Sequence, residues 1–114
     1  MKKDPQAYLR HILHSIESIE KYLKGVSQNK FLASERIQDL VTRRIEIIGE
    51  AARQIPEKFR KQHPQIPWRD IGDMRNVLIH MYFEVDYKIV WKTATKLVPV
   101  LKKQIREILE SDIT

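Results

Sequence analysis

Apolar residues recur at steps of three and four along most of the chain, the spacing of one face of an α-helix. The first stripe comprises Tyr8, Ile12, Ile16, Ile19 and Leu23. Asp4-Pro5 precedes it as a typical N-cap followed by proline at the first helical position. Gly25 follows it, and glycine ends helices in the left-handed conformation. The pattern predicts a first helix from about Pro5 to Lys24.

A second stripe predicts the longest helix of the chain, from about Phe31 to Gln54. Its members are Ile37, Val41, Ile45, Ile48, Ala52 and Ile55. The segment 26–32 is expected to be a short connection in which Ser27 and Asn29 act as turn or cap residues.

Three prolines in the segment 56–67 forbid a long helix there. Pro56 ends the second helix, and one helical turn is expected around Glu57 to Lys61. The rest of the segment is expected to be an ordered loop, which Trp68 pins to the core.

Two further helices are predicted in the second half of the chain. The third begins near Trp68 to Asp70 and carries a stripe formed by Ile71, Met74, Leu78 and Met81. The stripe breaks before Asp86, which is placed to be the N-cap of a fourth helix. The apolar residues of that helix are Ile89, Val90, Ala94, Leu97, Leu101, Ile105 and Ile108. Pro99 lies inside it and is expected to kink or split it.

These elements predict one all-α domain over residues 1–114. We find no internal repeat, no low-complexity stretch and no window that reads as a strand. The predicted architecture is an antiparallel four-helix bundle with a short fifth helix.

The composition limits the kinds of binding partner and active site that the chain can have. A net charge of +6 favours an anionic partner, with nucleic acid as the first candidate and a merely lysine-rich soluble surface as the alternative. The chain has no cysteine, which excludes disulfides, cysteine–zinc sites, iron–sulfur clusters and a thiol nucleophile. Its three glycines are too scattered to build a phosphate-binding loop or a dinucleotide fingerprint. His11 and His14 share a helix face, but the spacing offers no further ligands, so neither a metal nor a cofactor is expected.

The N-terminal residues and the hydropathy of the chain indicate where in the cell we expect the protein. Met1-Lys2-Lys3 is followed by Asp4-Pro5-Gln6 rather than by an apolar run, which argues against a signal peptide. No stretch approaches the roughly 18 apolar residues of a membrane span. We therefore expect a cytoplasmic protein that does not contact membranes.

The third helix carries the polar residues of interest. At 100° per residue, Asp73, Asn76 and His80 lie opposite its apolar stripe. Asn76 precedes His80 by four residues and is placed to orient it. Arg75 and His80 are five residues apart, which separates them by about 140° around a regular helix. Either the helix bends near His80, or two subunits contribute to a shared groove.

Two such helices facing each other across a twofold axis would gather two arginines and two histidines. Histidine titrates near neutrality and can move the proton of a ribose hydroxyl or of a leaving oxygen. Arginine presents a planar fork to phosphate oxygens. This constellation suits phosphodiester chemistry without a metal. In the alternative interpretation, His80 is a surface or capping residue, Arg75 pairs with an acid such as Glu50, and Tyr82 is a core aromatic.

The sequence from Arg75 to Tyr82 fits the pattern Arg-x4-His-x-Tyr and resembles the signature of HepT-type toxins of the HEPN superfamily. Three further blocks resemble that family in the same order along the chain. They are 47–52 (IIGEAA), 66–71 (IPWRDI) and 82–91 (YFEVDYKIVW). The resemblance extends from about Leu9 to Ile108.

The resemblance implies a helical bundle that dimerises through its motif helices, as a homodimer or a dimer of dimers. It implies a metal-independent endoribonuclease that acts on RNA, with Arg75 and His80 as catalytic residues. Tyr82 matches a tyrosine that a cognate nucleotidyltransferase antitoxin, MntA, modifies with AMP. Asp73 and Asn76 are expected to support the histidine or to contact RNA.

Two positions depart from the family pattern. Met81 stands where many relatives have a small residue, often glycine, and Val77 stands where many have a basic one. Met81 would narrow the groove, and Val77 would remove a phosphate contact. Two other functions therefore remain open: a non-catalytic subunit that docks a nucleotidyltransferase and presents its substrate, and a basic helical nucleic-acid binder whose affinity is steeply salt-dependent.

Overall fold

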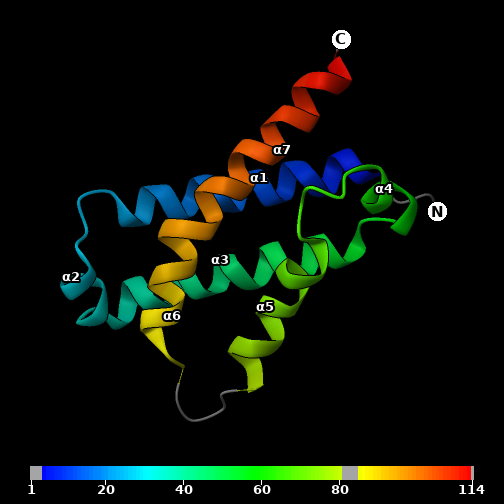
Figure 1. Ribbon diagram of the computed structural model, residues 1–114. Helices are drawn as coiled ribbons and strands as arrows, with labels where there is room; N and C mark the ends of the chain where they lie inside the picture. Colours follow the sequence, from blue (N-terminus) through cyan, green and yellow to red (C-terminus); the bar gives the residue numbers. More distant parts are fainter. Residues whose placement is uncertain (1–3, 81–84, 114) are drawn as a thin grey trace.

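The structure, a computed structural model, describes residues 4–80 and 85–113, and the side chains of residues 4–74 and 85–111. All regular structure in these ranges is helical, which confirms the all-α prediction (Figure 1). The helices are α1 (Pro5–Leu23), α2 (Gln28–Leu32), α3 (Glu35–Gln54), α4 (Glu57–Gln62), α5 (Trp68–His80), α6 (Tyr87–Lys92), the π-helical turn η1 (Thr93–Leu97) and α7 (Val98–Ile113).

The bundle is organised around α3. Helix α3 runs antiparallel to α1 along most of its length, and α5 packs on α3 at a steep angle (Figure 1). Helix α7 crosses α1. The short helices α2 and α6 both contact α3, near its N-terminal end (Figure 1). The core between these helices contains residues of the predicted stripes, including Ile16, Val41, Ile45, Ile48 and Ile105, each at most 1% exposed. No helix of the described segments has the length and apolar character needed to cross a membrane.

The predicted start and end of the first helix are confirmed. The Asp4 side chain accepts a hydrogen bond from the backbone N–H of Gln6 at 3.0 Å, and Pro5 occupies the first turn. Gly25 has a φ of 72°, a conformation that residues with a Cβ rarely adopt. The chain therefore leaves α1 through a glycine turn.

The prediction that the second long helix begins near Phe31 is wrong. Residues 28–32 form the separate helix α2, and Ser34 starts α3 by accepting a hydrogen bond from the N–H of Ile37 at 3.3 Å. The Gln38 amide donates to the carbonyls of Phe31 and Leu32, at 3.1 and 3.0 Å, and satisfies the end of α2. The described part of the chain thus has three short α-helices, α2, α4 and α6, where one was expected.

The predicted split near Pro99 is confirmed, and its form is a π-helical turn. The N–H of Val98 donates to the carbonyl of Thr93, five residues earlier. Proline has no N–H, and its ring clashes with the carbonyl four residues before it, here that of Thr95. The wider π turn lies immediately before Pro99 and separates α6 from α7.

Candidate functional site

The start of α5 is fixed by Trp68. Its side chain is 7% exposed, and its indole Nε1 donates to the carbonyl of His63 at 2.9 Å. The Phe59 ring lies edge-on to it, with ring centroids 6.3 Å apart. These contacts confirm that Trp68 pins the preceding loop, and they set the register of every later residue on α5.

The contact between α5 and α3 is close at Gly72. Gly72 and Ile71 are both buried, and a Cβ at position 72 would lie 3.0 Å from Cγ of Arg53. The missing side chain therefore makes room for Arg53 of α3 to lie across α5.

Asp73 forms an ion pair with Arg53, with Nη2 and Oδ1 3.6 Å apart. The two side chains are 53% and 40% exposed, and exposed pairs of this kind contribute about 0–1 kcal/mol. The structure thus places Asp73 at the contact between α3 and α5. That Asp73 supports His80 or contacts RNA remains a prediction.

The other predicted site residues are described only in part. Arg75, Asn76 and His80 belong to the backbone of α5, and their side chains lie outside the described residues. The AMP acceptor Tyr82 and its neighbour Met81 also lie outside them. Because α5 is helical through His80, Arg75 and His80 occupy positions about 140° apart around its axis.

An apolar groove of about 380 Å³ runs beside α5, between it and η1–α7. Helix α5 contributes Ile71 and Met74. The opposite wall includes Leu97 and Val100, which are 59% and 57% exposed. Large aliphatic side chains this exposed, next to the helix that carries the motif, mark a surface suited to protein contact.

Metal ligands do not gather in the described part of the chain, where no group of three or more His, Cys, Asp or Glu side chains could hold an ion. Asp70 and Asp73 line a pocket of about 270 Å³ together with the apolar residues Ile45, Met74 and Val90. No histidine or third carboxylate joins them in that lining.

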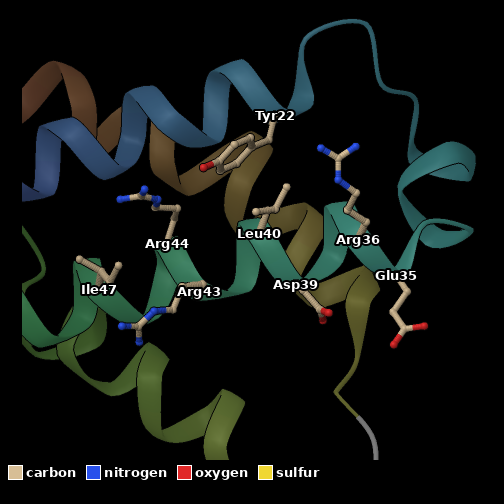
Figure 2. A pocket seen from close by; sticks show the side chains of 8 residues that line it. All are labelled: Tyr22, Glu35, Arg36, Asp39, Leu40, Arg43, Arg44 and Ile47. Atoms are coloured by element: carbon tan, nitrogen blue, oxygen red, sulfur yellow. The ribbon is translucent and has the colours of Figure 1, made fainter.

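A second groove was not predicted from the sequence. It measures about 660 Å³ and lies between α1 and α3 (Figure 2). Its wall contains Arg36, Arg43 and Arg44, which follow one another on α3 at steps of seven and one. That spacing places all three on one side of a helix and was the signal available in the sequence.

Comparison with known proteins gives consistent results. A family model described as "Ribonuclease HepT-like" matches residues 12–108. A "Putative RNase" of Caldanaerobacter subterraneus subsp. tengcongensis is 42% identical over 96% of this chain and 98% of its own. A "Probable ribonuclease HepT" of Thermococcus cleftensis is 41% identical over 95% and 98%.

A third relative is longer than this chain. It is named "Gamma-glutamylcyclotransferase and putative RNase", comes from Methanocaldococcus jannaschii and is 46% identical over 96% of this chain. The chain spans half of that protein's length. No solved structure matches the chain significantly.

Proposed function

The chain belongs to the HepT-like ribonuclease family, and from this membership we propose that it is a metal-independent endoribonuclease that uses Arg75 and His80. The observation that carries the proposal is the Arg-x4-His-x-Tyr pattern of residues 75–82, whose Arg75 and His80 belong to α5, within a chain matched by the family model over residues 12–108. In this proposal the protein is the toxin of a toxin–antitoxin pair.

The chemistry needs one proton acceptor, one proton donor and a group that stabilises negative charge. His80 of one protomer removes the proton from a ribose 2′-hydroxyl, and the oxygen attacks the adjacent phosphorus. The bond from phosphorus to the 5′-oxygen breaks, and that oxygen takes the proton that the same His80 has gained. The guanidinium of Arg75 holds the phosphate oxygens as their charge increases.

Two copies of the chain supply these groups in the proposed enzyme. On one α5, Arg75 and His80 lie about 140° apart around the axis, which does not direct both at one phosphate. A twofold axis beside α5 brings Arg75 of one copy to His80 of the other. The apolar groove between α5 and α7 supports a dimer contact beside the motif helix, because a partner would cover the exposed Leu97 and Val100. It lies on the Ile71–Met74 side of α5, about 120° to 180° around the axis from the position of His80, so it does not itself bring His80 to the twofold axis.

Leu97→Asp is expected to convert the dimer to a monomer. The change replaces an aliphatic side chain with a charge at two symmetry-related places, so the dimer Kd should rise about a hundredfold or more. Light scattering coupled to gel filtration would report a mass of 13.6 kDa per particle in place of twice that value. Arg106→Asp, at an exposed position on α7 outside the groove lining, is the control and should remain dimeric. If the Leu97→Asp protein remained dimeric, this groove would not be part of the dimer interface.

The proposed regulation acts on Tyr82. The phenol oxygen attacks the α-phosphorus of ATP on a cognate nucleotidyltransferase, pyrophosphate leaves, and the phenol loses its proton. The added phosphate would occupy the position of an RNA phosphate and repel substrate. Mass spectrometry after incubation with the enzyme and ATP should find AMP on wild-type protein and none on Tyr82→Phe.

The test of the proposed activity is cleavage of RNA in excess EDTA. The protein is made without a nucleotidyltransferase, and its intact mass is checked for added AMP. We expect the rate in EDTA to stay within about twofold of the rate in Mg²⁺, since the proton transfers and charge stabilisation come from His80 and Arg75. Cleavage that requires Mg²⁺ would contradict metal independence. No cleavage by the unmodified protein would favour the non-catalytic docking subunit.

A further inference from the structure

The groove between α1 and α3 lies apart from the motif helix. All of its lining residues come from those two helices: Tyr22 from α1, and Glu35, Arg36, Asp39, Leu40, Arg43, Arg44 and Ile47 from α3 (Figure 2). The groove is therefore a surface of the single protomer, and it uses no residue of the proposed catalytic site.

Two of its arginines have no close carboxylate partner in the described part of the chain. Neither Arg36 nor Arg44 forms an ion pair in the described part of the chain, and Arg36 is exposed. Arg43 has a partner, Glu46, but their charged atoms are 3.7 Å apart and the Arg43 side chain is 71% exposed. The arginines are thus available to an anion.

The two acids that line the groove, Glu35 and Asp39, lie on the side away from α1. Figure 2 shows Glu35 and Asp39 directed away from Arg36 and Arg44. The pKa of the Tyr87 phenol on α6 is raised by burial and by the charges of Asp39 and Glu35, and α6 contacts α3. The half of the groove that faces α1 therefore contains two cations and no nearby carboxylate of its own lining.

The same half offers a surface for a flat ring. The Tyr22 ring lies across from Leu40 and Arg44 (Figure 2), and Tyr22 and Leu40 are both half-buried. Arg36 and Arg44 are eight residues apart, about 12 Å along the helix axis. Cations at intervals along a groove, beside an aromatic ring, are what single-stranded nucleic acids bind, through phosphates and stacked bases.

We propose that the groove lined by Tyr22, Arg36 and Arg44 binds a single-stranded segment of the RNA substrate outside the Arg75–His80 site. This inference rests on the proposed ribonuclease function and assigns part of its substrate binding to α1 and α3. The charge pattern favours RNA over an acidic peptide, because the aromatic wall accepts bases and the guanidinium groups accept phosphates.

The test is binding of a fluorescein-labelled, single-stranded 2′-O-methyl RNA, which cannot be cleaved through a 2′-hydroxyl. Fluorescence anisotropy at several salt concentrations gives Kd and its salt dependence. Arg36→Gln/Arg44→Gln should raise Kd roughly tenfold or more. The slope of log K against log salt should fall in magnitude by about 1.4, or 0.7 for each lost phosphate contact on a single strand.

A matched control removes the same charge elsewhere. Lys103→Gln/Arg106→Gln changes two exposed cations of α7 and should leave the salt slope at the wild-type value. Tyr22→Leu should weaken binding about fivefold or more by removing a stacked base contact, whereas Tyr22→Phe keeps the ring and the affinity. Circular dichroism establishes that each variant retains its helices.

Kinetics separate this inference from the proposed function. In cleavage of unmodified RNA, Arg36→Gln/Arg44→Gln should raise KM much more than it lowers kcat. If wild-type protein cleaves RNA and the groove variant has the Kd and salt slope of the α7 control, the groove inference is overturned and the ribonuclease stands. If the groove variant instead loses only affinity for a poly-glutamate peptide, the inference is equally overturned. If wild-type protein neither binds nor cleaves RNA, both proposals fail.

Discussion

Replacing His80 with alanine is expected to lower kcat for RNA cleavage by about 10²- to 10⁴-fold, the contribution of a positioned general acid or base. Alanine cannot accept the 2′-hydroxyl proton, and it cannot return a proton to the leaving 5′-oxygen. The measurement is the initial rate of cleavage of a labelled RNA in EDTA, with protein whose intact mass shows no added AMP.

The control for His80→Ala is His14→Ala, since His14 is an exposed histidine of α1. His14→Ala should cleave at the wild-type rate, and both variants should bind 2′-O-methyl RNA with similar Kd. A His80→Ala protein that cleaves at the wild-type rate would exclude His80 from the chemistry.

Replacing Arg75 with alanine is expected to lower kcat/KM by about 10²- to 10³-fold, as removal of a group that stabilises transition-state charge does. Arg75→Lys should recover only part of this loss, because an ammonium lacks the planar fork that holds two phosphate oxygens. The measurement is kcat/KM with the same RNA in EDTA.

Arg69→Ala is the matched control for Arg75→Ala. Arg69 is an exposed arginine in the first turn of the same helix, and its loss should change kcat/KM by less than about threefold. If Arg75→Ala retained most of the wild-type kcat/KM while Arg69→Ala did not, the assignment of Arg75 would be wrong.

Local signals account for how well the helices could be predicted. Asp4 and Asp86 both cap helices as expected, with their side chains accepting from Gln6 and Lys88 at 3.0 Å. Each signal is contained within a few residues, because an N-cap bonds a backbone N–H two or three positions later. The same holds for Gly25, whose left-handed conformation follows the end of the first helix.

The break before α3 has a local signal, the Ser34 N-cap, and a tertiary one, the packing of Phe31. Phe31 packs its ring against those of Tyr87 and Trp91, with centroids 6.4 and 5.4 Å away. Those partners are more than fifty residues distant along the chain. Helical spacing did not require Phe31 in the same helix as Ile37, because six positions place it about 120° around a regular helix from the stripe that Ile37 begins.

The candidate site also has features that one helix determines and features that the packing of two helices determines. The spacing of Arg75 and His80 on one helix could be predicted from the sequence, because it depends only on helical periodicity. The pairing of Asp73 with Arg53 and the groove at Tyr22 could not, since each requires the angle and register at which two separate helices cross.

The most direct test of the proposed shared site is to mix the two inactive variants, Arg75→Ala and His80→Ala, under conditions where protomers exchange. Each mixed dimer then has one site with an intact Arg75 from one copy and an intact His80 from the other. Random pairing should restore about a quarter of wild-type activity, because half of the dimers are mixed and each has one of two sites. A mixture that stays as inactive as its separate components would contradict a catalytic site shared between two copies.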